Sequence, residues 1–253
     1  MQVSDPVRFR RPAGNTATGW LKIIALVFMF IDHSGKMLFP SVPEMRILGR
    51  VAFPIYVWCM IVGFHYTRSV PKYLLRILAV GVLSQPLYMI ALRHPWNEPN
   101  IFLTLLLGLC ALWGIREKKA GSQLWAPVIA IVLAALLKAD YGWKGVLLFV
   151  LLYAVRDSRP GIAAVMVAFF LFWGASYSVT KSLFGLSFDV NALPAFLSTP
   201  LSAFLRLQTY ALFSLPFILI PFPRDLKMPR WAGYALYPGH LVLLYVLELC
   251  FRG

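Results

Sequence analysis

Charged residues are scarce in this sequence of 253 residues: Asp, Glu, Lys and Arg together make up 13%, against about 25% in an average soluble domain. Acidic residues are the scarcest, with ten Asp and Glu against 24 Lys and Arg. After Trp20 no polar stretch is long enough to fold separately. Because 60% of the residues are hydrophobic and the mean hydropathy is +0.72, this scarcity excludes a soluble protein and predicts one membrane domain.

Cysteine is also rare, and Cys59, Cys110 and Cys250 each lie inside an apolar run without paired spacing. This pattern argues against a disulfide framework or a zinc motif, and no metal is expected. The formal charge of +14 does not indicate nucleic-acid binding, because the basic residues form short clusters between apolar runs. Such clusters are typical of the cytoplasmic loops of membrane proteins, so the expected partner is the lipid bilayer.

The apolar runs predict an all-α, polytopic integral membrane protein with about nine transmembrane helices, since about 20 apolar residues cross the hydrocarbon layer. A cytoplasmic arm, 1–19, would precede a transmembrane domain, 20–253. The first run resembles a signal peptide, but it contains Asp32 and His33 where a cleavage site would be needed, so we expect it to remain as an anchor. The expected spans are 20–39, 51–66, 73–92, 100–115, 124–138, 143–155, 161–180, 200–222 and 231–251.

The distribution of basic residues predicts the orientation of these spans. With the N-terminus inside, fourteen of the 24 Lys and Arg residues lie on the cytoplasmic side, nine lie on the other, and Lys22 lies within the first span. An odd number of spans then places the C-terminus outside. The fifth and sixth spans are short, and part of the polar turn between them, 138–144, is expected to lie below the membrane surface.

Two ionisable residues share one face of the first span. Lys22 and His33 are eleven residues apart, almost three helical turns and about 16 Å along the axis, with Leu26 and Met29 between them. Lys22 is either a snorkelling anchor or a site residue. An ionisable group within a span usually faces the protein interior or a wet cavity, so His33 is either structural or functional. Asp32 points elsewhere on the helix and could bind Lys36, one turn on.

Other polar residues are candidates with ordinary alternatives. Arg50 could be an interface anchor or a site residue, and Arg46, one turn earlier, is equally ambiguous. Asp140, in DYGWKG, could orient His33 or an acceptor, because a carboxylate beside two lysines should stay ionised in a polar cavity, or it could be an ordinary loop aspartate. His240, in the last span, could be catalytic or a core histidine bonded to a carbonyl. His65 and His94 lie at loop edges and are expected to be structural or solvated.

The blocks LKIIALVFMFIDHSGKML, RILGRVAFPIYVW, FHYTRSVPKYLLRIL, DYGWKGVLL and YPGHLVLL carry a resemblance to a known family. Over most of its length the chain resembles the TraX family, proteins associated with acetylation of conjugative pilin. TraX proteins in turn resemble the wider transmembrane acyltransferases, whose first helix carries an arginine, ten intervening residues and a histidine. Lys22 and His33 have that spacing, but a lysine cannot make the bidentate contact of an arginine, so only the histidine carries over, as the catalytic residue.

The resemblance implies transfer of an acetyl group from cytoplasmic acetyl-CoA, the donor, to an acceptor outside. A neutral histidine suits removal of the acceptor's proton, and His33 would do so with support from Asp32 and Asp140. Candidates for binding donor or acceptor are Lys22, Arg50, Tyr141 and His240. The pantetheine arm of the donor would thread inward to reach His33, and its phosphates would stay among cytoplasmic Lys and Arg residues.

The location and acceptor follow from the same resemblance. It implies the cytoplasmic (inner) membrane of a bacterium and, as acceptor, the N-terminal amine of a pilin. The wider superfamily implies a hydroxyl or amine of an envelope glycan instead. A transporter is a second class of function, but it would be expected to show inverted repeats, and none is visible. A third class, a structural assembly factor, would need no histidine within the membrane.

Overall fold

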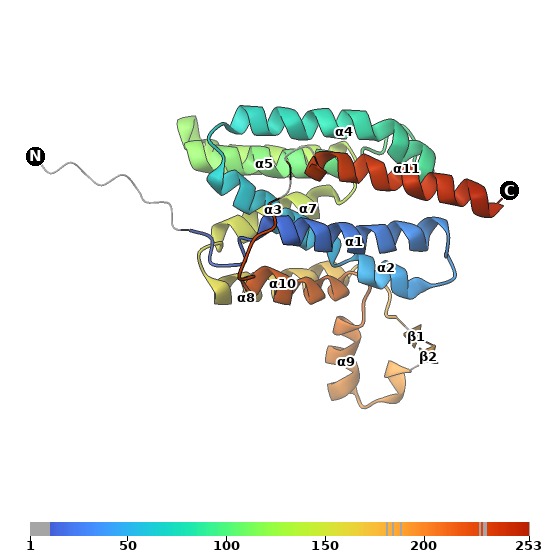
Figure 1. Cartoon of the computed structure of the whole chain (residues 1–253). Coiled ribbons are helices and arrows are strands. Elements are labelled where there is room, and N and C mark those ends of the chain that lie inside the picture. Colours follow the sequence, from blue (N-terminus) through green and yellow to red (C-terminus); the bar gives the residue numbers. More distant parts are fainter. Residues whose placement is uncertain are drawn as a thin grey trace, which may run out of the picture.

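A computed structural model describes residues 11–252 apart from 181, 184, 188, 228, 230 and 231. Long helices lie roughly along one axis (Figure 1), with α4, α5 and α11 on one side, α1 and α3 in the middle, and α8 and α10 on the other. The helices are α1 (Thr18–Met37), α2 (Pro43–Gly49), α3 (Ala52–Tyr66), α4 (Val70–Leu92), α5 (Ile101–Glu117), α6 (Ser122–Leu136), α7 (Gly142–Ala154), α8 (Arg159–Gly174), α9 (Ala195–Phe204), α10 (Leu215–Leu219) and α11 (Ala232–Arg252). Short 3₁₀ turns are η1 (Lys119–Gly121), η2 (Val190–Ala192) and η3 (Thr209–Ser214), and a two-stranded hairpin pairs β1 (Ser182–Leu183) with β2 (Leu186–Ser187).

Helix α3 forms the centre of the bundle. It is apolar on all sides, which is typical of a helix surrounded by other helices, and Phe53, Trp58 and Phe64 are fully buried. The indole N–H of Trp58 donates to the backbone oxygen of Asn15 at 2.7 Å, which ties the segment before α1 to the core. Helix α1 packs against α2, α3 and α11, so the first and last helices of the chain are neighbours.

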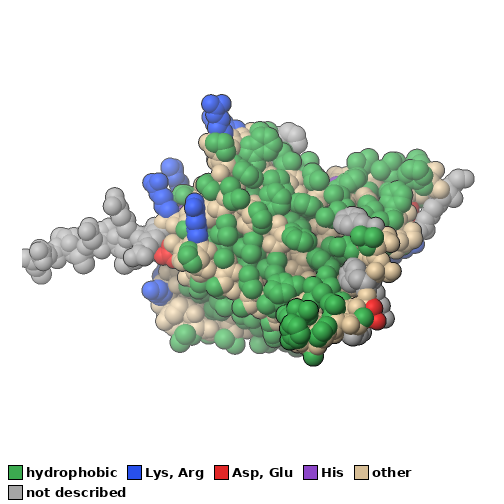
Figure 2. Space-filling model, turned by 90° about the horizontal axis from the view of Figure 1, so that it is seen from below, with side chains coloured by type: hydrophobic (Ala, Val, Ile, Leu, Met, Phe, Trp, Pro, Cys, Tyr) green, Lys and Arg blue, Asp and Glu red, His purple; other side chains and the backbone are tan. Residues whose placement is uncertain are grey.

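The outer faces of the bundle are apolar. Large hydrophobic side chains are exposed along α4, α6 and α11, among them Leu83, Leu124 and Leu249. Figure 2 shows hydrophobic side chains spread over one face, with several Lys and Arg side chains gathered toward one end. An apolar surface this broad marks contact with a membrane in a chain of this composition. The protein is therefore a helical membrane protein.

Most of the expected spans coincide with helices. The runs 20–39, 51–66, 73–92, 100–115, 124–138, 143–155, 161–180 and 231–251 correspond to α1, α3, α4, α5, α6, α7, α8 and α11. Among the described residues, four helices are long and apolar enough to cross a membrane, and they are 43–66, 70–92, 119–136 and 232–251. The count of about nine spans is not confirmed. Residues 1–10 of the expected arm, 1–19, lie outside the described residues.

The expected span 200–222 is wrong as a single helix. The chain there passes from α9 through η3 into α10, with a break after Phe204. Pro200 and Pro216 remove backbone donors, while Arg206 and Gln208 place polar groups within the break. Helix α9 and the β1–β2 hairpin project beyond the bundle (Figure 1). The short helix α2, which was not expected, precedes α3 and carries Arg46.

Candidate functional site

His33 and His240 meet between the first and last helices. The Nδ1 atom of His33 lies 2.8 Å from the Nε2 atom of His240, and the two rings stack with centroids 5.0 Å apart. His33 comes from α1 and His240 from α11. Because these helices are joined by nearly the whole chain, the sequence placed both histidines within spans but gave no sign that they touch.

The hydrogen bonds of the pair fix which ring nitrogens carry protons. The Nδ1 atom of His240 lies 3.3 Å from the carbonyl oxygen of Leu236, which can only accept, so this nitrogen donates. In the neutral ring the Nε2 atom of His240 is then an acceptor, and the Nδ1–H of His33 donates to it. This leaves the Nε2 atom of a neutral His33 with a free lone pair, the form that a general base needs.

Asp32 points away from His33 and binds two arginines. Its Oδ2 accepts from Arg46 at 2.8 Å and its Oδ1 accepts from Arg50 at 2.6 Å, so its partner is not Lys36. Gly49 at the end of α2 permits this contact, because a Cβ atom there would collide with the Asp32 carboxylate. Asp32 therefore holds Arg50 in place, while a binding role for Arg50 stays a prediction. A direct catalytic role for Asp32 stays a prediction.

A polar cavity of about 430 Å³ opens in front of His33. The candidates Asp32, Arg50, Asp140 and Tyr141 line it together with His33, so the structure brings five of the predicted residues together. Gln208, which sequence reasoning missed, also lines it. Its side chain is buried, and among the described residues neither its amide nitrogen nor its amide oxygen has a hydrogen-bond partner. A buried unpaired amide of this kind is a ready contact for a polar ligand.

The turn that carries Asp140 and Tyr141 enters the cavity wall before α7. The left-handed backbone of Gly142, with φ of 55°, reverses the chain there. The Tyr141 ring stacks on Phe53 with centroids 3.7 Å apart. Burial raises the pKa of Asp140 above its ordinary value, although Arg50, His94 and Lys36 oppose this shift. His240, and not Asp140, hydrogen-bonds His33, and the two roles suggested for Asp140 stay predictions.

The outer wall of the polar cavity contains a second linked group. The Lys36 Nζ atom lies 2.6 Å from the His94 Nε2 atom, and His94 Nδ1 lies 2.7 Å from a Glu98 oxygen. The His94 ring also stacks on Tyr88. His94 was expected to be structural or solvated, but it lies in the cavity wall. His65, by contrast, contacts Tyr66 at the far end of α3.

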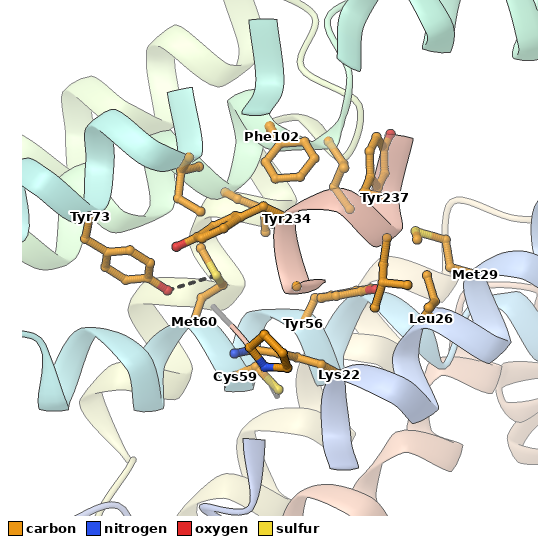
Figure 3. A pocket seen from close by; sticks show the side chains of 16 residues that line it. Lys22, Leu26, Met29, Tyr56, Cys59, Met60, Tyr73, Phe102, Tyr234 and Tyr237 are labelled. Atoms are coloured by element: carbon orange, nitrogen blue, oxygen red, sulfur yellow. Dashed lines mark hydrogen bonds between the residues drawn. The ribbon is translucent and has the colours of Figure 1, made fainter. Parts of the chain in front are cut away.

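A second, mostly apolar cavity of about 220 Å³ follows the N-terminal half of α1. Figure 3 shows Lys22, Leu26 and Met29 on one side of it, with side chains of α3, α4, α5 and α11 completing the wall. Lys22 and His33 thus share the expected face of α1 but belong to different cavities. Tyr237 lines the apolar cavity and contacts the His240 ring edge-on at 5.3 Å. The histidine pair therefore stands between the two cavities.

The fold and this site together define a helical membrane protein with a paired-histidine centre between its first and last helices. Comparison with known proteins identifies the family. The TraX family, described as "TraX protein", matches residues 17–248, and the chain belongs to this family.

Three relatives illustrate the range of the family. The chain is 29% identical over 247 residues to "Probable fimbrial assembly protein FimC, serogroup H1" of Dichelobacter nodosus, covering 88% of this chain and 92% of the relative. It is 29% identical over 160 residues to "Protein TraX" of Escherichia coli, covering 58% of this chain and 62% of that protein. An uncharacterized protein of Rickettsia prowazekii is 35% identical over 97 residues, 38% of this chain and 37% of the relative. No solved structure matches the chain.

Proposed function

We propose that this protein transfers an acetyl group from cytoplasmic acetyl-CoA to the N-terminal amine of a pilin outside the inner membrane. The observation that supports this most directly is the state of His33. The hydrogen bond to His240 holds a neutral His33 in the tautomer whose Nε2 atom is a base, at the edge of a polar cavity and close to an apolar one. A purely structural assembly factor would have no need of a base in this position.

The apolar cavity suits the donor's pantetheine arm, which is long, narrow and mostly uncharged. Its length along α1, from Lys22 toward Met29, leads the thioester to the histidine pair. Lys22 stands at the start of that path, where its ammonium group could contact an amide or phosphate of the donor. The acetyl carbonyl would then lie beside His33, within reach of the neighbouring polar cavity.

The polar cavity suits the acceptor. A neutral amine nitrogen attacks the thioester carbon, the new C–N bond forms, and the C–S bond breaks. His33 Nε2 takes the proton that the amine loses, and this proton then passes to the departing thiolate of CoA. Gln208 and Asp140 line the same cavity and offer an amide and a carboxylate to the acceptor backbone.

An amine acceptor is the less demanding substrate for this base. A free α-amine has a pKa of roughly 7.7–8.0, so an appreciable fraction is neutral near pH 7. A sugar hydroxyl is far less acidic and would depend more strongly on an oriented carboxylate, yet Asp140 does not contact His33 in the described part of the chain. The link of related proteins to fimbriae by name agrees with a pilin.

The test is an incubation of membranes with radiolabelled acetyl-CoA, followed by measurement of the mass of mature pilin from cells with and without the gene. We expect labelled pilin and one acetyl group on its first residue, lost on deletion of the gene. An unmodified pilin beside an acetylated envelope glycan would contradict the amine acceptor. If no product is labelled at all, the protein assists assembly without this chemistry.

A further inference from the structure

A basic recess lies at the turn between α3 and α4. It has a volume of about 510 Å³ and is lined by Tyr66, Thr67, Arg68, Ser69, Lys72 and Arg76. Its three cationic side chains are exposed, and no acidic residue lines it. Among the residues that the structure describes, no ion pair joins Arg68, Lys72 or Arg76 to a carboxylate. The recess therefore holds three positive charges that the rest of the described chain leaves uncompensated.

The recess adjoins the apolar cavity. On α4, Lys72 and Arg76 line the recess, while Tyr73 and Ile77, one residue further along, line the apolar cavity. The two rows of side chains run at the same height on neighbouring faces of one helix. The start of α4 also lies at the same end of the bundle as the start of α1 (Figure 1), where Lys22 enters the apolar cavity.

We propose that this recess binds phosphate groups, and specifically those of the nucleotide end of the acetyl-CoA donor. Arg68, Lys72 and Arg76 would hold the anionic nucleotide outside the hydrocarbon layer while the uncharged arm passes Tyr73 into the apolar cavity. Arginine and lysine at helical spacing match a pyrophosphate and a separate phosphate ester, and the N-terminus of α4 adds its positive end. The inference rests on the proposed function for the identity of the donor.

An anionic lipid headgroup offers the same phosphate chemistry. The nucleotide is favoured because adjacent residues of α4 line the recess and an apolar cavity that suits an uncharged arm, and a lipid would not need that neighbour. The two sources differ in a measurable way. Acetyl-pantetheine carries the same thioester and arm as acetyl-CoA but has no phosphate, so only acetyl-CoA can use the recess.

The experiment compares the two donors in wild-type protein and in the variants Arg68→Gln, Lys72→Gln and Arg76→Gln. The protein is reconstituted once in phosphatidylcholine vesicles and once with added phosphatidylglycerol. We expect each substitution to lower about tenfold the ratio of kcat/KM for acetyl-CoA to that for acetyl-pantetheine, in both kinds of vesicle. Lys118→Gln, an exposed lysine at the end of α5 outside the recess, is the matched control and should keep the wild-type ratio.

A ratio that stays unchanged in the three variants would overturn the inference. A ratio that falls in the variants only when phosphatidylglycerol is present would also overturn it, because the recess would then bind a lipid headgroup. Direct binding of radiolabelled CoA separates this inference from the proposed reaction. Wild-type binding that weakens about tenfold in each variant supports the recess even if no acetyl group is transferred, whereas equal binding by all forms contradicts it.

Discussion

His33 and His240 are 207 residues apart in the sequence and share one hydrogen bond of 2.8 Å. The bond gives each ring a distinct task. His240 accepts a hydrogen bond from His33 Nδ1–H and donates its own Nδ1–H to a backbone carbonyl, so a neutral His33 is held in the tautomer whose Nε2 atom is unprotonated. An isolated histidine in a helix would be free to adopt either tautomer, and one of the two presents the wrong nitrogen.

Replacement of His33 tests this assignment. We expect His33→Ala to lower acetyl transfer by about 10²–10⁴-fold, because a general base contributes that much, while the protein stays folded in the membrane. Gln123→Ala, at the exposed start of α6 and outside the two cavities and the basic recess, is the control. Initial rates with radiolabelled acetyl-CoA decide the matter. Full activity of a well-expressed His33→Ala protein would return this residue to a structural role.

The ion pairs of Asp32 with Arg46 and Arg50 lead to a second prediction for single residues. Only 11% of the Arg50 side chain is exposed, whereas 35% of the Arg46 side chain is exposed. Loss of a hydrogen bond to a buried charge costs about 1–3 kcal/mol, so Arg50→Gln should lower the free energy of unfolding by about that amount. Arg46→Gln should cost less, because solvent screens its ion pair. Thermal unfolding of the detergent-solubilised variants measures both, and an equal or reversed order would contradict the assignment of Asp32 as a clamp on Arg50.

The sequence identified single site residues better than their partners. Lys22 and His33 could be placed on one face because both lie in one helix of known period. The pairs His33–His240 and Asp32–Arg50 depend on which helices pack together and where α2 turns, and a single apolar pattern carries no such information. Gln208 was missed because a lone glutamine in an apolar run gives no chemical signal until its amide is seen buried and unpaired.

At the scale of the elements, apolar runs predicted helices where the pattern is continuous. The runs of α1, α3 and α11 are of this kind. The prediction failed between α9 and α10, where hydropathy is high but prolines and a 3₁₀ turn interrupt the hydrogen bonds. The polar turn before α7 was recognised, and the structure shows why it matters: it carries Asp140 and Tyr141 into the wall of the polar cavity.

That turn has a cost in stability that depends on pH. Burial raises the pKa of Asp140, so the folded protein holds this proton more tightly than the unfolded chain does. As pH rises above about 3.9, the pKa of an aspartate in the unfolded chain, ionisation of Asp140 therefore begins to lower the free energy of unfolding. This loss of stability is complete once the pH exceeds the pKa of Asp140 in the folded protein. Asp140→Asn should raise Tm at pH 7, and the gain should disappear below about pH 4.

The same variant should transfer acetyl groups more slowly, because the acceptor loses a carboxylate contact. A gain in stability combined with a loss of activity is characteristic of a functional site. Glu117→Gln, an exposed acid at the end of α5, serves as control and should change neither quantity appreciably. Unfolding curves between pH 4 and 8 are the measurement, and a lower Tm for Asp140→Asn at pH 7 would show that its charge stabilises the fold.

At the scale of the whole molecule, the two ends of the bundle differ in chemistry. The basic recess and the start of the apolar cavity lie at the end where the chain enters, and the polar cavity lies at the other end of α1. Helices α1 and α11 run in the same direction, so the start of α1 and the end of α11 lie at opposite ends of the bundle (Figure 1). The proposed reaction needs such a polarity, because donor and acceptor are on opposite sides of the membrane.

The positions of the termini are directly testable. Reporter fusions should place the N-terminus in the cytoplasm and the C-terminus outside, since the basic clusters favour that orientation and α1 runs parallel to α11. A reporter active only in the cytoplasm and one active only outside, each fused to both ends, give four matched measurements. Both termini in one compartment would mean that α11 does not cross in the direction of α1.

The same polarity predicts that acetyl transfer is vectorial. Acetyl-CoA is highly charged and does not cross a bilayer, so donor added to sealed vesicles reaches only the face that is turned outward. Inverted vesicles expose the cytoplasmic face, with Arg68, Lys72 and Lys22 at that end of the bundle, and should label an acceptor enclosed within them. Right-side-out vesicles should give no label until a mild detergent opens them, and then should match the inverted ones. Equal labelling by both sealed preparations would show that the donor is accepted from either face of the membrane, which would contradict a path along α1 from the apolar cavity to the polar one.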